Sequence, residues 1–282
     1  MSSGPDPWLQ TAWDARAAAN FMHGGAGSGL VVASALATLA GGGPRWPCVV
    51  GARLVMLGLT AVWAEIGRPW RALNVFINPR TSWMTREALV APAVPGLALA
   101  AVVVPPAFAR PVAALAVLAA LGFVYCQGRI LRAARGIPAW REPAIVPLIM
   151  ATALAEGAGL WLLLGGAASA PAWLALGLAL AARQWLWMRW RSRVRSAPAA
   201  MAVIARAGRV FQFATLLPLA AVVLALGAPL PPAAAMVLQL ATGLLVLAGG
   251  LWFKFTLITR AAFNQGFSIT HLPVRGVHRR EQ

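Results

Sequence analysis

The sequence has few charged residues, and very few of them are acidic. Only 11% of its 282 residues carry a formal charge and 60% are hydrophobic, whereas about 25% are charged in a typical soluble domain. A soluble protein of this composition would expose large apolar patches, but lipid acyl chains solvate such a surface at no cost. The composition therefore argues against a soluble domain and predicts an integral membrane protein.

Cysteine and histidine are also scarce. Cys48 and Cys126 lie far apart, with no CxxC motif and no Cys/His cluster, so neither a disulfide framework nor a zinc or iron–sulfur site is expected. A bis-histidine haem needs two imidazoles that face each other in the membrane, yet His271 and His278 both fall in a polar tail. We expect no metal and no haem in this chain, although a methionine ligand leaves haem as a minor alternative.

Basic residues outnumber acidic residues by 24 to seven, which gives a formal charge of +17. The arginines occupy short connections between apolar runs. This pattern orients helices in anionic membranes and differs from the basic stripe that follows a nucleic-acid backbone. We therefore expect no nucleic-acid partner.

Eight apolar segments are each long enough to cross about 30 Å of hydrocarbon as a helix. They lie at about 18–40, 47–66, 87–108, 112–131, 144–166, 171–190, 207–227 and 233–256. Glycine and proline mark most of their ends, and Pro92, Pro95, Pro147 and Pro218 are expected to kink helices rather than end them. The sequence predicts an all-α integral membrane protein with one transmembrane domain over residues 1–282 and a tail at 257–282.

An even number of helices places both termini on one side of the membrane. The connections on that side then hold 20 basic residues, against two on the other side, Arg45 and Arg110. This asymmetry over short loops predicts that both termini are cytoplasmic.

Polar and ionisable residues gather where four of these segments reach the cytoplasmic side. They are Asn20, His23, Glu65, Arg86, Glu87, Tyr125, Gln127 and Arg129. Asn20 and His23 are three residues apart, so in an α-helix they share a face. Such groups are costly near lipid and are functional candidates by default.

This set of residues suits a quinone, which takes up two protons with two electrons and needs hydrogen-bond partners at both oxygens. We expect His23 and Glu87 to be the leading proton-handling pair, with Glu65 close behind. The expected quinone-binding residues are Asn20, His23, Gly24, Glu65, Trp83, Arg86, Glu87, Tyr125 and Gln127. Small residues in the run "HGGAGSG" at 23–29 allow close approach by another helix or by a flat ring.

Simpler structural roles remain open for several of these residues. His23 could bond to a neighbouring helix, and Glu65–Arg68 and Arg86–Glu87 could be ion pairs at loop ends. Glu156 and Arg183 have no partner visible in the sequence, so a structural ion pair and a proton route are equally open.

Three stretches carry a resemblance to a known family. They are "WDARAAANFMHGGAGSG" at 13–29, "EIGRPWRALNVFINPRTSWMTREAL" at 65–89 and "CQGRILRAARGIPAWREP" at 126–143. With the eight-helix plan, the chain resembles the membrane-anchor subunits of molybdopterin oxidoreductases of the dimethyl sulfoxide reductase and polysulfide reductase type, the DmsC/NrfD-like family. Its C-terminal stretch "FKFTLITRAAFNQGFSITHLPVRG" resembles anchors grouped with phenylacetyl-CoA:acceptor oxidoreductases.

The resemblance implies a haem-free subunit of a bacterial inner membrane that reacts with ubiquinone or menaquinone. It implies two partners, an iron–sulfur subunit with [4Fe-4S] clusters and a catalytic subunit with a molybdenum bis-pterin cofactor. The asymmetry of basic residues, and not the resemblance, puts the expected partners on the cytoplasmic face. Glu87 matches a family carboxylate implicated in quinol handling, whereas Glu65 stands where some members have histidine. The expected docking residues are Arg68, Arg71, Arg80, Arg129 and Arg132.

Two other functions remain open on the sequence alone. An ion-coupled transporter would also have eight helices with buried Glu and Arg residues, although the ionisable groups here gather at one face and not at the midplane. A structural anchor without a quinone pocket of its own is the other alternative.

Overall fold

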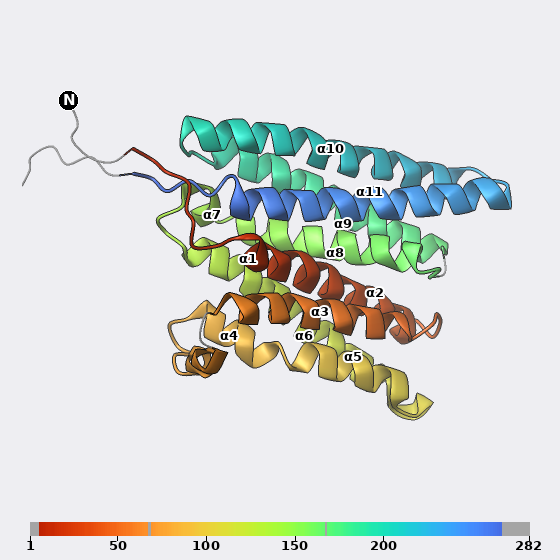
Figure 1. The fold of residues 1–282 in the computed structure, drawn as a ribbon. Helices are drawn as coiled ribbons and strands as arrows, with labels where there is room; N and C mark the ends of the chain where they lie inside the picture. The colour runs from red at the N-terminus through yellow and green to blue at the C-terminus, as the bar shows by residue number, and fades with distance from the viewer. Residues whose placement is uncertain (1–5, 67–68, 167, 267–282) are drawn as a thin grey trace, which may run out of the picture.

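The chain is mostly helical in the part that the computed structural model describes, residues 6–66, 69–166 and 168–266 (Figure 1). Within that part, β pairing is limited to one bridge between Leu9 and Phe263. The helices are α1 (Ala15–Ala19), η1 (Asn20–Gly24), α2 (Gly25–Leu39), α3 (Pro47–Glu65), η2 (Pro69–Phe76), α4 (Trp83–Val90), α5 (Ala93–Val103), α6 (Pro106–Ala133), α7 (Pro138–Arg141), α8 (Ile145–Leu163), α9 (Ala170–Arg193), α10 (Pro198–Gly227) and α11 (Pro232–Thr259).

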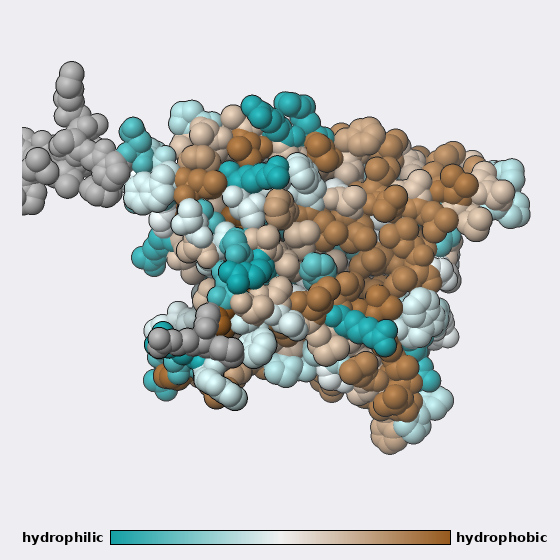
Figure 2. All heavy atoms as spheres, in the orientation of Figure 1, coloured by the Kyte–Doolittle hydropathy of each residue, from teal (hydrophilic) through white to brown (hydrophobic). Residues whose placement is uncertain are grey.

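Seven helical stretches in the described residues are long and apolar enough to cross a membrane. They are Ala15–Leu39, Pro47–Glu65, Trp83–Val103, Pro106–Ala133, Ile145–Leu163, Pro198–Gly227 and Pro232–Thr259. Figure 2 shows hydrophobic side chains over the middle and right of the bundle. The chain is thus an all-α protein of the multi-pass membrane class. The predicted segment at 171–190 is helical as well, as α9, but Arg183 and Gln184 lower its mean hydropathy and it is not one of the seven.

The helices form two groups of four. In the first group, α2, α3, α5 and α6 pack in a ring, with α4 resting on α6. In the second group, α8, α9, α10 and α11 pack in the same way. The groups meet mainly where α2 and α6 pack on α8. Figure 1 shows the axes of the long helices lying nearly parallel to one line, with α10 and α11 joined at one end.

Glycines set the distance between α2 and its neighbours. A Cβ atom on Gly29 would lie 1.9 Å from the carbonyl oxygen of Ala153 in α8, and one on Gly157 would lie 1.9 Å from the Gly29 carbonyl carbon. On the opposite side, a Cβ on Gly27 would lie 2.6 Å from the Gly51 carbonyl oxygen in α3. The run at 23–29 therefore brings helix backbones together, as small residues do in membrane bundles.

Several predicted helix boundaries are corrected by the structure. The expected crossing at 87–108 is the stretch Trp83–Val103, which is interrupted because α4 ends at Val90 and α5 begins at Ala93. Pro92 lies in this interruption, since proline lacks the N–H that would continue the ladder. Helix α4 also begins earlier than predicted, at Trp83, because the Ser82 side chain caps it by accepting from the Thr85 N–H at 3.3 Å.

The two ends of the described chain lie side by side. The Gln10 N–H donates to the Ala262 carbonyl at 3.0 Å, and the Asn264 N–H donates to the Trp8 carbonyl at 3.0 Å. Figure 1 places both segments at the left end of the bundle. The predicted tail at 257–282 is helical as far as Thr259, whereas His271 and His278 lie outside the described residues.

The glycine contact between α2 and α8 generates a stability prediction. We expect Gly29→Ala to lower the free energy of unfolding by about 2 kcal/mol or more, because the backbone of α8 cannot move away as a flexible side chain can. Gly96→Ala in α5 is the matched control, since a Cβ there meets no atom within 4 Å and alanine favours helix by up to about 1 kcal/mol. Denaturation of the purified protein in mixed micelles measures both variants. Equal stability of the two would contradict the close contact.

Candidate functional site

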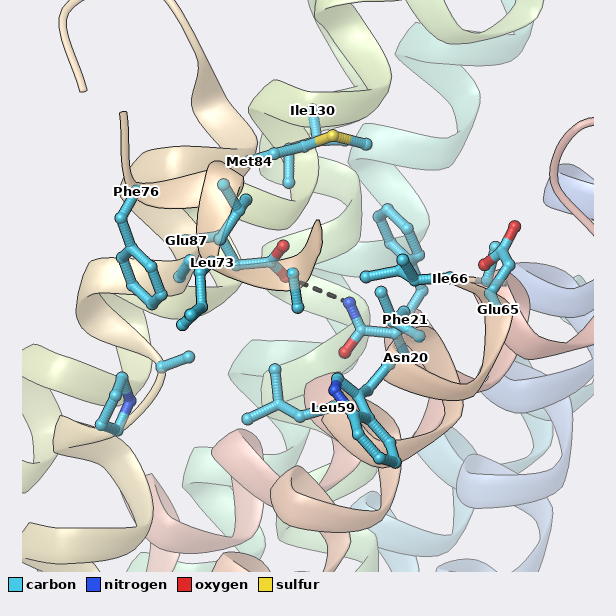
Figure 3. A pocket seen from close by; sticks show the side chains of 18 of the residues that line it. Asn20, Phe21, Leu59, Glu65, Ile66, Leu73, Phe76, Met84, Glu87 and Ile130 are labelled. Atoms are coloured by element: carbon cyan, nitrogen blue, oxygen red, sulfur yellow. Dashed lines mark hydrogen bonds between the residues drawn. The ribbon is translucent and has the colours of Figure 1, made fainter. Parts of the chain in front are cut away.

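A cavity of about 560 Å³ lies in the first group of helices, between η1, α3, η2 and α4 (Figure 3). Its walls are mostly apolar. They are formed by Trp13, Ala17, Asn20, Phe21, Leu59, Val62, Trp63, Glu65, Ile66, Ala72, Leu73, Val75, Phe76, Met84, Glu87, Ala88, Ala91, Pro92 and Ile130. Trp63, Leu73 and Met84 are also exposed at the surface, so the cavity opens to the outside beside η2.

Glu87 and Asn20 place polar atoms in this apolar space. Both side chains are buried, and the Asn20 Nδ2 donates to Glu87 Oε1 at 3.2 Å (Figure 3). The Asn20 Oδ1 is buried without a hydrogen-bond partner in the described structure. A buried acceptor without a donor is costly unless something else supplies one. The cavity thus offers two acceptors to a donor group on a ligand, the free Asn20 oxygen and the Glu87 carboxylate.

The local sequence explains how these two side chains come together. Asn20 begins η1, a single π-helical turn inside the first membrane helix, and such turns occur often at functional sites. Gln127 in α6 supports this turn, because its Nε2 donates to the Asn20 carbonyl at 3.0 Å. Glu87 lies one turn into α4, whose start is fixed by the Ser82 cap and by a hydrogen bond from the Thr85 hydroxyl to the Val75 carbonyl of η2.

Glu65 lies at the edge of the cavity, as the last residue of α3, and is half-buried. An ion pair between Arg16 and Asp14, at 2.9 Å, lies close by, because Arg16 also donates to the Ala64 carbonyl at 3.0 Å. The hydrogen bond from the Arg16 side chain holds the pKa of the exposed Asp14 carboxyl below its usual value. Arg68 is not among the described residues, so the expected ion pair between Glu65 and Arg68 is not tested by the structure.

His23 and Gly24 do not line the cavity, contrary to the expectation that His23 shares a face with Asn20. The π-turn inserts an extra residue per turn and so alters the spacing on which that expectation rested. The His23 ring is half-buried, and its Nδ1 donates to the Ala19 carbonyl at 3.0 Å. Gly24 instead faces α6, where a Cβ would lie 2.9 Å from both Gln127 Nε2 and Phe123.

Trp83, Arg86 and Tyr125 also lie outside the cavity lining, in a separate cluster with Arg129. Arg86 makes no ion pair with its neighbour Glu87. Its Nε donates to the Pro79 carbonyl at 2.8 Å and its Nη2 to the Arg80 carbonyl at 2.7 Å. Of the predicted quinone-binding residues, the structure therefore gathers Asn20, Glu65 and Glu87 around the cavity and places Gln127 directly behind Asn20.

The predicted docking arginines that the structure describes are at the surface. Arg71, Arg80 and Arg132 are exposed and Arg129 is half-buried. Arg71 belongs to η2, the element that also supplies Leu73 and Phe76 to the cavity wall. The same short helix thus touches the cavity on one side and carries part of the basic surface on the other.

The sequence did not reveal the partner of Glu156. Lys254 in α11 donates to Glu156 Oε2 at 2.5 Å, and both side chains are fully buried. Arg183 is also fully buried and donates to the Thr215 hydroxyl at 2.7 Å and to the Ala214 carbonyl at 2.5 Å. A lysine in an otherwise apolar run was the available signal, since such a residue needs a buried partner.

Comparison with protein-family models and with curated proteins finds no match to this chain. Within residues 6–66, 69–166 and 168–266, no three His, Cys, Asp or Glu side chains come together as a set of metal ligands.

The Asn20–Glu87 hydrogen bond generates a prediction about stability. We expect Glu87→Leu to lower the free energy of unfolding by about 2 kcal/mol relative to Glu87→Gln, because leucine leaves the buried Asn20 amide without an acceptor whereas glutamine keeps a side-chain oxygen. Denaturation in mixed micelles measures the difference. The same pair of changes at Glu142, between α7 and α8, is the control and should show no comparable gap; a gap of equal size there would contradict the role of Asn20.

Proposed function

We propose that this chain is the membrane-anchor, quinone-reactive subunit of a molybdenum oxidoreductase complex. It exchanges electrons between ubiquinone or menaquinone in the bilayer and a docked iron–sulfur subunit with [4Fe-4S] clusters. A molybdopterin subunit holds the substrate site of this complex. The observation that carries the proposal is the apolar cavity with the buried Asn20–Glu87 pair in its wall.

The size and lining of the cavity support a quinone as its ligand. Its volume of about 560 Å³ lies within the range of small-molecule sites, roughly 300–1,000 Å³. Apolar side chains such as Leu59 and Phe76 suit a ring and an isoprenoid chain, and the opening beside η2 would admit a ligand from the membrane.

The polar atoms of the cavity suit the proton chemistry of a quinol. A bound quinone supplies two-electron redox chemistry, in which two protons move with the electrons. A quinol hydroxyl donates a hydrogen bond, and the free Asn20 Oδ1 is a matching acceptor. The Glu87 carboxylate can take the proton as a general base, oriented by the Asn20 amide. Glu65, at the edge of the cavity, would pass protons between this site and water.

The proposed membrane topology requires α9 to be an eighth membrane crossing. Both ends of the described chain are hydrogen-bonded together, and seven crossings would leave them on opposite sides of the membrane. Helix α9 has 24 residues and packs between α8 and α10, which supports its inclusion. The 20 to 2 distribution of basic residues supports cytoplasmic termini, and we propose that both partner subunits bind at this face of a bacterial inner membrane.

Electron transfer requires the docking surface to lie near the cavity, and η2 meets this requirement. Its residues Leu73 and Phe76 line the cavity, while Arg71 and the nearby Arg80 are exposed. The resemblance of residues 65–89 to molybdoenzyme anchors covers this same segment. We propose Arg71, Arg80 and Arg132 as contacts for an acidic surface on the iron–sulfur subunit.

An ion-coupled carrier is the second candidate, and the buried Glu156–Lys254 pair favours it. Paired charges inside a helix bundle often mark transport pathways. Co-purification separates the two functions. An anchor is recovered from its native membrane with two larger subunits that contain iron and molybdenum, whereas a carrier is recovered without them.

The assignment of Glu87 is tested in the purified complex. We expect Glu87→Gln to lower quinone-linked turnover by about a hundredfold, because glutamine accepts the Asn20 hydrogen bond but cannot take a proton. Turnover with a water-soluble dye that bypasses the anchor should be unchanged, with the subunits still assembled. Glu142→Gln, the same change away from the cavity, is the control and should retain full turnover. Normal quinone-linked turnover by Glu87→Gln would reject this site.

A further inference from the structure

A cluster of aromatic and basic side chains lies on the outer face of the first group, apart from the cavity. The Cζ atoms of Arg86 and Arg129 lie 4.1 Å and 4.2 Å from the centre of the Trp83 ring. Tyr125 packs edge-on against Trp83, with ring centres 5.7 Å apart, and its hydroxyl accepts from Arg129 Nη1 at 2.6 Å. We call these four residues the Trp83 cluster.

The two positive charges of the Trp83 cluster have no carboxylate partner in the described part of the chain, where the ion pairs are Asp14–Arg16 and Glu156–Lys254. Arg129 hydrogen-bonds through Nη1 alone, and Arg86 through Nε and Nη2. Stacking on an indole uses the face of a guanidinium and leaves its N–H edge free. The cluster therefore presents free donors and two unneutralised charges, which an anion with several oxygens would satisfy.

The surface that leads to this cluster is apolar and faces outward. On α6, residues 115, 118, 122, 125 and 129 follow each other at spacings of three and four, so they form one stripe along the helix. Leu115 and Leu118 in this stripe are 52% and 67% exposed. Leu89 on the neighbouring α4 is 55% exposed. An apolar strip within a membrane-spanning helix thus ends at a pair of arginines beside a tryptophan and a tyrosine.

We propose that the Trp83 cluster binds the phosphodiester headgroup of an anionic phospholipid, whose acyl chains lie along Leu115, Leu118 and Leu89. Arg86 and Arg129 donate to the phosphate oxygens, and the aromatic rings hold the guanidinium groups at the level of the headgroups. An acidic segment of a protein partner fits the site less well, because the apolar strip continues into the membrane-spanning part of α6. The proposal does not depend on a quinone in the cavity.

The test uses the purified full-length chain, depleted of lipid and titrated with phosphatidylglycerol, with bound lipid counted by native mass spectrometry. We expect Arg129→Gln to bind phosphatidylglycerol about five- to tenfold more weakly than the unchanged chain. Arg129→Lys, which keeps the charge but loses the planar fork, should give an intermediate value. Arg135→Gln is the matched control, because Arg135 lies just after the end of α6 and is exposed but does not contact Trp83; it should bind normally.

Four results would overturn the proposal. The first is equal binding by Arg129→Gln and Arg135→Gln. The second is equal retention of zwitterionic phosphatidylcholine, which would mean that the negative charge is not recognised. The third is displacement of phosphatidylglycerol by inorganic phosphate at matched concentration, which would make the cluster a site for free anions. The fourth is preferential binding of an acidic peptide, which would assign the surface to a protein partner. If Arg129→Gln fails to fold, Tyr125→Phe, which removes only the hydroxyl that holds Arg129, gives the same comparison.

Discussion

Close backbone contact on both sides of α2 holds this molecule together. Gly27 touches α3 and Gly29 touches α8 at distances that exclude a side chain. Association of helices in lipid gains little from the hydrophobic effect, so tight packing of this kind must supply much of the stability. The glycines also fix how far η1, directly before α2, stands from α3. The cavity and its polar wall therefore depend on contacts made one to two turns further along the same helix.

The cavity combines an apolar lining with a buried polar pair, one atom of which, Asn20 Oδ1, is unsatisfied in the described structure. This combination is what makes it a candidate site. A buried acceptor such as Asn20 Oδ1 destabilises the folded protein unless a ligand or water provides a donor. Its neighbour Gln127 likewise leaves its Oε1 unpaired, behind the same turn of helix. Both of these amides are held at a π-turn, where the regular ladder of backbone hydrogen bonds is already interrupted.

Apolar runs of about 20 residues predicted the all-α membrane class and seven helical stretches of spanning length, because a helix is the form in which such a run satisfies its own backbone in lipid. Helix ends were less predictable. The apolar pattern alone does not mark the start of α4 after Ser82 or the interruption at Pro92. The gathering of Asn20, Glu65 and Glu87 followed from the side of the membrane on which their helices end. The position of His23 could not be predicted, because a π-turn depends on packing and leaves no signal in the hydrophobic pattern of the sequence. The Glu156–Lys254 pair joins residues 98 positions apart, a separation at which sequence pattern carries no pairing information.

Lys254 is the only lysine among the 282 residues, and it is fully buried against Glu156. The folded chain therefore offers no lysine amine to reagents that acylate or cross-link amines, and no lysine to a protease that cleaves after this residue. The other 23 of its 24 lysine and arginine residues are arginines, which these reagents do not modify. Labelling of lysine side chains in a complex that contains this chain would report on its partners, and reaction at Lys254 would mark opening of the bundle.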